Sequence, residues 1–218
     1  MKIREELAEL VGTFTLVFIG AGAGALAVGG DSGGGLVGVA LAHGLALVVI
    51  IYAWGAISGA HVNPAVTFGL ALTGRFPWLR ALRYWAAQFL GAALAGYLLL
   101  FLIGPQGNLG MTLPASSVSI VQAIGIEAVL TFFLVTAVFG SAVAGRNGNG
   151  AALAIGLVLA MDILMGGPLT GGSMNPARSF GPALAMGNFT DLYVYFIGPL
   201  LGGGLAALFF DRVYLRSR

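Results

Sequence analysis

Cysteine is absent from this chain of 218 residues, and charged side chains are scarce at 8%. The lack of cysteine excludes disulfide frameworks, thiol catalysis and cysteine-ligated metals. A water-soluble domain has about 25% charged residues, so this chain has too little polar surface to face water. The sequence also lacks a Ser-His-Asp constellation and a metal-ligand cluster. We therefore expect no enzyme activity, no cofactor, no metal and no nucleic-acid partner.

Hydrophobic residues make up 58% of the chain and gather in long runs. A helix needs about 20 apolar residues to cross a bilayer. The first run is longer than the apolar core of a signal peptide, so we expect it to be retained. The pattern predicts an all-α membrane protein with crossings at about 7–28, 36–56, 80–103, 120–143, 150–167 and 189–210.

Basic residues are distributed unequally about these crossings. With six crossings both termini lie on one side, and nine of the ten basic residues fall there, all except Arg178. Such a bias marks the cytoplasmic side. We expect a multi-pass protein, of the cell membrane, with cytoplasmic termini and the basic residues Lys2, Arg4, Arg75, Arg80, Arg83, Arg146, Arg212, Arg216 and Arg218 on that side.

Two stretches, Ser58–Leu72 and Thr170–Leu184, are copies of one another 112 residues apart. A duplicated element is typical of membrane proteins built from inverted repeats, whose site lies where the repeats meet. We predict one domain over 1–218, with repeats over about 1–103 and 118–218 and a connecting loop over 104–117. The glycine runs 20–24 and 29–35 are typical of a helix end and a loop, and those at 91–96 and 202–204 of close helix packing.

Each copy contains Asn-Pro-Ala. Asparagine is a preferred N-cap and proline favours the first helical turn, so each motif predicts a half-helix, over about 64–72 and 176–185. Irregular backbone at membrane depth is tolerated only inside protein or along a watery cavity. The fold class is therefore six transmembrane helices plus two re-entrant half-helices, with a central site made of Asn63, Pro64, Ala65, Asn175, Pro176 and Ala177.

The two asparagines predict a specific chemistry. Each side-chain oxygen caps its own half-helix and leaves the NH₂ group pointing off the helix end, where a helix start carries about half a positive charge. Two such ends meeting near the midplane would bind the oxygen of a water molecule. That water cannot accept from its neighbours in the file, so proton transfer is interrupted and cations are repelled.

The segments GAHVNPAVTFG and GGSMNPARSFG resemble the signature of the aquaporin (major intrinsic protein) family, and the resemblance covers essentially the whole chain. It implies the inverted-repeat fold of that family, passive single-file water conduction, and a homotetramer in membrane lipid with one pore in each subunit. Arg178 replaces the Val66 of the first repeat, and a membrane arginine usually faces a water-filled cavity.

The resemblance places the outer selectivity filter at His43, Ile163, Gly172 and Arg178. This quartet is similar to that of certain plant tonoplast intrinsic proteins, a subset that also passes ammonia. That subset has a histidine in the connecting loop, and this chain has none there. Passage of ammonia in addition to water is therefore a hypothesis.

Glycerol channels of the family carry Asp and Lys where this chain has Ser179 and Ala183, and Tyr195 and Phe196 match the aromatic pair of water channels. Water is therefore favoured. Gly172 widens the opening, so a broader small neutral solute facilitator of the glycerol type stays open.

The resemblance also implies that a group of polar residues braces the loops through hydrogen bonds, namely Glu9, Glu127, His61 and Gln88. Asp162 has no such assignment. A carboxylate at this depth needs a partner, on a neighbouring helix or in a neighbouring subunit.

Three other functions are considered. A coupled secondary transporter also uses inverted repeats, but amide donors are poor ligands for a coupling cation. A structural or adhesion protein would have bulky filter residues, and Gly172 argues against it. An ion channel would need a carbonyl filter or an acidic ring, and neither is present.

Overall fold

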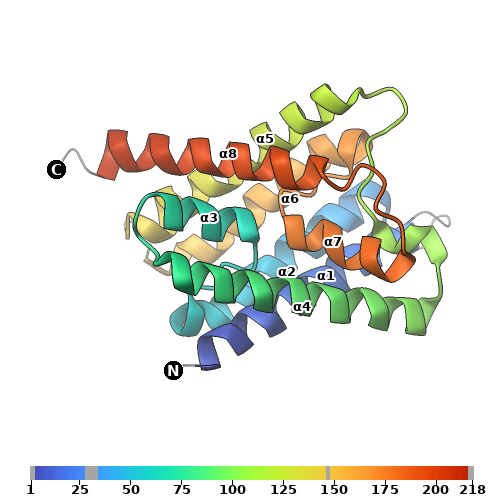
Figure 1. Ribbon diagram of the computed structural model, residues 1–218, viewed down its shortest axis with the longest axis horizontal. Helices are drawn as coiled ribbons and strands as arrows, with labels where there is room; N and C mark the ends of the chain where they lie inside the picture. Colours follow the sequence, from blue (N-terminus) through green and yellow to red (C-terminus); the bar gives the residue numbers. More distant parts are fainter. Residues whose placement is uncertain (1–2, 28–33, 146–147, 216–218) are drawn as a thin grey trace.

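The computed structural model describes residues 3–27, 34–145 and 148–215, which form helices joined by irregular segments, with no strand among them (Figure 1). This confirms the predicted all-α fold. Four of the basic residues counted above, Lys2, Arg146, Arg216 and Arg218, lie outside the described residues.

The described part of the chain contains six helices that are long and apolar enough to cross a membrane. Their bounds follow the predicted runs closely. The last begins at Val194 rather than near residue 189, because Asn188 Oδ1 accepts from the Thr190 amide and Asp191 adopts a left-handed conformation with φ of 52°. The helices are α1 (Ile3–Ala27), α2 (Gly35–Ser58), α4 (Trp78–Ile103), α5 (Ile120–Ala137, continued by a π-helical turn over Val138–Val143), α6 (Ala151–Thr170) and α8 (Val194–Phe210, continued by a π-helical turn over Asp211–Leu215).

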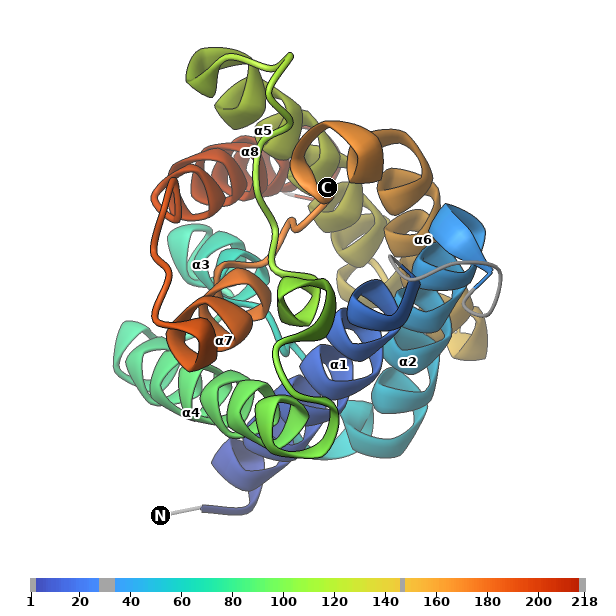
Figure 2. The ribbon, with the colours of Figure 1, turned by 90° about the vertical axis from the view of Figure 1, so that its right-hand side faces the viewer.

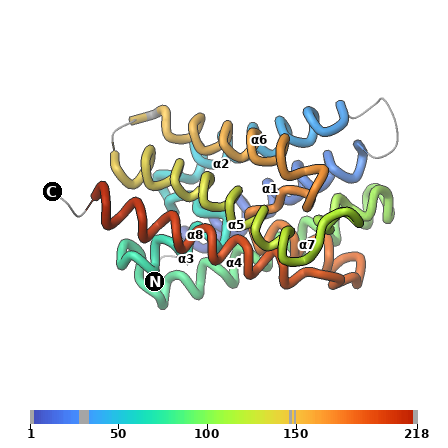
Figure 3. The backbone as a smooth tube through the Cα atoms, turned by 90° about the horizontal axis from the view of Figure 1, so that it is seen from above, coloured from blue at the N-terminus to red at the C-terminus, as the bar shows by residue number. Residues whose placement is uncertain are grey.

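Two short helices, α3 (Pro64–Leu72) and α7 (Pro176–Met186), begin at the Asn-Pro-Ala motifs. They occupy opposite halves of the molecule along its long axis (Figures 1 and 3). The helix α3 packs mainly on α8, and α7 mainly on α4. Each short helix therefore packs on a long helix from the other half of the sequence.

The long helices surround the two motif loops. Contacts run from α4 to α1, from α1 to α2, from α2 to α6, from α6 to α5 and from α5 to α8. Seen from one end, α3 and α7 lie between α8 and α4 and complete the ring (Figure 2). Both ends of the described chain, the start of α1 and the end of α8, lie at the same end of the bundle (Figure 1).

Glycine allows the helix backbones to approach closely. A Cβ added at Gly91 would collide with the Leu10 carbonyl of α1, and one at Gly202 with the Ala128 carbonyl of α5. These contacts agree with the expected role of small residues in membrane helix packing. The run from Gly20 to Gly24, however, lies inside α1 and is not a helix end.

The connecting segment is more structured than a plain linker. Its residues Gln106–Gly110 form a short turn that packs against α1, and Leu109 is fully buried there. Gly110 has a φ of 62°, and an added Cβ would collide with the Ala21 carbonyl. The sequence shows turn formers here, but it does not show that they cover α1.

Candidate functional site

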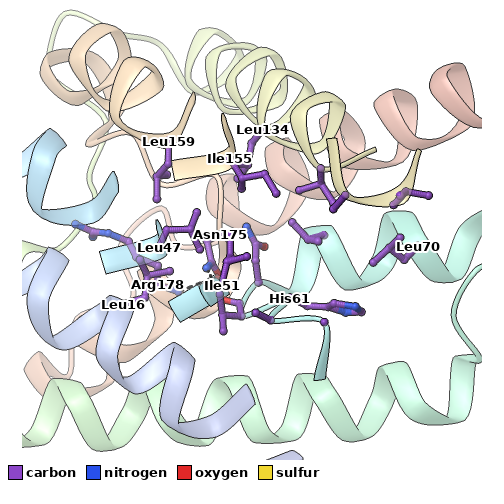
Figure 4. Close-up of a pocket in the computed structure, with 18 of the residues that line it drawn as sticks. Leu16, Leu47, Ile51, His61, Leu70, Leu134, Ile155, Leu159, Asn175 and Arg178 are labelled. Atoms are coloured by element: carbon purple, nitrogen blue, oxygen red, sulfur yellow. Dashed lines mark hydrogen bonds between the residues drawn. The ribbon is translucent and has the colours of Figure 1, made fainter. Parts of the chain in front are cut away.

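A cavity of about 390 Å³ follows the two motif loops inside the bundle. Arg178 and His61 lie toward opposite ends of it, with Asn175 between them (Figure 4). It continues to Arg75 and Phe76, beyond the end of α3. Much of the remaining lining is aliphatic and includes Leu16, Leu47, Ile51, Val66, Leu134, Val138, Ile155 and Leu159.

The two asparagines cap the short helices as predicted from the motif. The side-chain oxygen of Asn63 accepts from the Ala65 amide at 2.8 Å. That of Asn175 accepts from the amides of Ala177 at 3.0 Å and Arg178 at 3.3 Å. In both helices proline is the first residue, where its missing N–H leaves no intrahelical bond unmade.

The amide nitrogens bind across to the opposite loop. Asn63 Nδ2 donates to the Met174 carbonyl at 2.9 Å, and Asn175 Nδ2 donates to the Val62 carbonyl at 2.9 Å. A carboxamide has two N–H donors, so one on each asparagine is used by protein. This differs from the sequence-based picture, in which the whole NH₂ group faces the lumen; a single N–H per asparagine is left for it.

Glu9 on α1 organises the first loop. Its carboxylate accepts from the Ser58 hydroxyl at 2.7 Å and from the backbone amides of His61 at 2.9 Å and Val62 at 2.6 Å. The Gln88 amide donates the fourth bond, at 2.8 Å. A buried charge is tolerated only when its oxygens are satisfied, and here four donors converge on it.

Glu127 on α5 has the same relation to the second loop. It accepts from the Thr170 hydroxyl at 2.7 Å and from the backbone amides of Ser173 at 2.9 Å and Met174 at 2.7 Å. Both carboxylates thus bind the two amides that precede an asparagine. This fixes the loop backbone that presents each N-cap.

His61 and Ser173 occupy equivalent places in the two loops. His61 Nδ1 lies 3.1 Å from the Thr67 hydroxyl of α3, which also accepts from Gln88 at 3.1 Å. Ser173 Oγ lies 2.6 Å from the Ser179 hydroxyl of α7. In both loops, therefore, this side chain bonds to a hydroxyl in the first turns of the adjacent short helix.

Two tyrosines that sequence reasoning did not assign to the loops complete them. Tyr84 donates to the Ser58 carbonyl at 2.9 Å, and Tyr195 to the Thr170 carbonyl at 2.7 Å. These carbonyls end α2 and α6, where a helix leaves acceptors unpaired. The tyrosines are separated in sequence by nearly the same distance as the motifs, which is the signal that identifies them.

Arg178 and His43 lie in direct contact and are 3% and 2% exposed. Arg178 Nε donates to His43 Nε2 at 3.2 Å, and one terminal nitrogen donates to the Gly110 carbonyl at 2.7 Å. His43 Nδ1 lies 2.9 Å from the Val39 carbonyl. A carbonyl only accepts, so Nδ1 carries the proton, Nε2 is the acceptor and the imidazole is neutral.

The other two predicted filter residues adjoin each other. A Cβ added at Gly172 would lie 3.3 Å from the Ile163 Cα, and Gly172 has a φ of 57°. Neither residue is among those that line the cavity, whereas His43 and Arg178 both line it. The structure thus places the four in two pairs, His43 with Arg178 and Ile163 with Gly172, and only the first pair lines the cavity.

A chain of hydroxyls lies beside Arg178 and was missed from sequence. Thr112 Oγ1, in the connecting segment, lies 2.7 Å from Ser179 Oγ, which in turn contacts Ser173. Together with the Gly110 carbonyl, this chain ties the connecting segment to the second loop. Nothing in the linear sequence indicates that these distant segments meet.

Asp162 lies on α6 and is 1% exposed, and neither of its oxygens has a hydrogen-bond partner among the described residues. It precedes Gly166 by one turn, and a Cβ at Gly166 would meet Leu130 of α5. Residues four apart share a helix face, so Asp162 faces α5. Because the single chain already buries it, the suggestion that it faces a neighbouring subunit is wrong.

The described residues contain no group of three or more acidic or histidine side chains placed to hold a metal ion. The side chains around the cavity supply instead amide and guanidinium donors, a neutral imidazole and aliphatic surface.

Comparison with known proteins shows what this arrangement resembles. The major intrinsic protein family model matches residues 1–210. The chain is 46% identical to aquaporin TIP4-4 of Zea mays, in an alignment that covers 82% of this chain and 73% of that protein. It is 42% identical to aquaporin TIP2-1 of Arabidopsis thaliana over 99% of its length and 89% of that protein.

The fold is also similar to a solved structure. The X-ray structure of the aquaglyceroporin from Plasmodium falciparum superposes with a TM-score of 0.90 and 26% sequence identity, covering 100% of this chain and 98% of that one. The likeness therefore extends over the whole bundle, including both short helices.

Proposed function

The chain belongs to the major intrinsic protein family, whose members are membrane channels and not enzymes, and we propose that it conducts water passively and in single file. It is an integral, multi-pass membrane protein. The observation that carries the proposal is the pair of asparagines, each with one free N–H beside the same cavity.

The two free N–H groups explain conduction without proton leakage. A water molecule at this point accepts from both asparagines, and both short helices direct their positive ends toward it. Its hydrogens then point outward along the file, so it cannot relay a proton from one neighbour to the other. The aliphatic side chains of the lining offer water no competing hydrogen bonds, so the water file can move.

We assign the outer filter to His43, Ile163, Gly172 and Arg178. The guanidinium repels cations and donates to passing water, and the neutral imidazole adds no charge of its own. We assign to Ile163 an apolar part of this filter and to Gly172 the position without a side chain, although neither is among the residues that line the cavity.

The solute range includes water and, by hypothesis, ammonia, because a neutral molecule of similar size makes similar hydrogen bonds. A broader small neutral solute facilitator is the second candidate. It is supported by the absent side chain at Gly172 and by the likeness to the Plasmodium falciparum aquaglyceroporin. Ser179 and Ala183 favour the water channel.

We place the protein in the cell membrane with cytoplasmic termini, as a homotetramer in lipid with a pore in each subunit. Two basic residues pair with acidic residues near the ends of the described chain: Arg75, between α3 and α4, with Asp211 at 2.7 Å, and Arg80, in the first turn of α4, with Glu5. These two pairs put Arg75 and Arg80 at the end where the described chain begins and ends, which supports cytoplasmic termini through the positive-inside bias.

Osmotic shrinkage of proteoliposomes tests the proposal. Vesicles containing the protein should shrink several-fold faster than protein-free vesicles, without any ion gradient and without acidification. Repeating the measurement with glycerol and ammonia gradients separates the two candidate solute ranges. Shrinkage that requires a sodium or proton gradient would favour a coupled transporter, and shrinkage at the protein-free rate would refute the channel.

A further inference from the structure

We propose that Gly20, in the middle of α1, is a positioning residue that sets the width of the outer constriction by making room for the imidazole of His43. The inference rests on the proposed role of His43 and Arg178 in solute selection. It concerns a residue of a helix that contributes nothing to the filter itself.

The imidazole lies directly against the Gly20 backbone. A Cβ added at Gly20 would overlap three atoms of the His43 ring, Cδ2, Nε2 and Cε1. Gly91 and Gly202 differ, because an added Cβ there would meet the backbone of a packed helix. The space left by the missing side chain is therefore filled by the side chain of His43 at Gly20, but by the backbone of a neighbouring helix at Gly91 and Gly202.

The ring has only one direction in which to yield. Its Nδ1 is bonded to the Val39 carbonyl at 2.9 Å, and Nε2 is bonded to Arg178 Nε at 3.2 Å. The remaining side is the cavity, which both His43 and Arg178 line. A side chain at position 20 would therefore push the ring away from α1 and into the cavity, where it would narrow the water path.

The displacement required is large relative to the path. Non-bonded carbon atoms settle about 3.5–4.0 Å apart, so relief of the overlap needs a shift of about 1 Å. A water molecule has a radius of about 1.4 Å, so a single-file path does not tolerate such a shift. The same shift breaks the bond from Arg178 and changes the direction of the guanidinium.

The first test compares Gly20→Ala with Gly125→Ala in proteoliposomes. Gly125 is also inside a membrane helix, but an added Cβ there meets nothing within 4 Å. We expect Gly20→Ala to lower osmotic water permeability several-fold, and Gly125→Ala to leave it at the wild-type value. Wild-type permeability in a folded Gly20→Ala protein would overturn the proposal. The proposed channel function is tested separately, by the water permeability of the wild-type protein.

The second test separates positioning from general damage to α1. In a His43→Ala background the ring is gone, so adding Gly20→Ala should leave water and glycerol permeability unchanged. A further several-fold loss in the double variant would show that Gly20 acts without His43, and would overturn the proposal. If Gly20→Ala fails to fold, folding of the double variant supports the proposal and failure of both overturns it.

Discussion

The amide nitrogens of Asn63 and Asn175 each donate to the backbone carbonyl of the residue that precedes the other asparagine, at 2.9 Å in both directions. Each side chain is therefore fixed by its own helix through oxygen and by the opposite loop through nitrogen. Neither cap can turn without breaking a bond made by the other half of the chain. The orientation of the last free N–H follows from this reciprocal arrangement.

Replacing one of these amides by a carboxylate should change ion selectivity. Asn175→Asp loses the donor to the Val62 carbonyl and adds a full negative charge beside the water path. A unit charge acting at about 4 Å contributes about 4 kcal/mol in a partly polar environment, which is enough to offset the positive helix ends. We expect water flow to persist and cation conductance to rise by more than about tenfold.

Liposome flux assays with sodium and proton gradients measure this effect. Asn188→Asp is the matched control, because Asn188 is exposed at the end of α7 and its Oδ1 already acts as an acceptor. Unchanged cation exclusion in Asn175→Asp would contradict the electrostatic explanation.

Glu127→Gln should destabilise the second loop. The glutamine NH₂ would face donors, since the carboxylate accepts from Ser173, Met174 and Thr170. A buried donor left without a partner costs about 1–3 kcal/mol, so the free energy of unfolding should fall by about that amount. Thermal unfolding in detergent measures it, with Asp191→Asn between α7 and α8 as the control. Equal melting temperatures for the two variants would argue against the bracing role.

The two tyrosines should contribute similarly despite lying in different halves of the chain. Tyr84→Phe and Tyr195→Phe each remove one hydrogen bond to a helix-terminal carbonyl, with an expected loss of about 1–2 kcal/mol. Tyr97→Phe, on the exposed face of α4, is the control and should be neutral. A large effect of one tyrosine and none of the other would show that the two loops are not held alike.

Asp162→Leu should raise stability. Both carboxyl oxygens are buried without a partner among the described residues, and such a group costs about 1–3 kcal/mol. Asp211→Leu provides the contrast, because Asp211 Oδ1 accepts from Arg75 Nε at 2.7 Å and that variant should lose stability. Unfolding measured side by side should give opposite signs. A loss in Asp162→Leu would mean that the carboxyl binds something other than this chain.

Local chemistry explains why much of the fold can be predicted from the sequence. Apolar runs of membrane length gave the long helices, and Asn63-Pro64 and Asn175-Pro176 gave the starts of α3 and α7, because capping depends on neighbouring residues alone. The glycines at 20–24 were assigned wrongly to a helix end, since a glycine retained for a neighbouring side chain has no local signature. At Gly20 the neighbouring side chain is that of His43, which belongs to another helix.

The sequence by itself determined that the chain spans the membrane as helices, that the segment around Asn-Pro-Ala occurs twice, and that two capped half-helices begin at these motifs. Only the tertiary structure decided how many N–H donors of each asparagine remain for water, which backbone carbonyl accepts from Arg178, and how much space His43 needs. These depend on contacts between segments that are distant in the chain. Every residue has a backbone carbonyl, and a glycine in the sequence does not show which distant side chain occupies the space beside it. Residue identities alone therefore do not reveal these contacts.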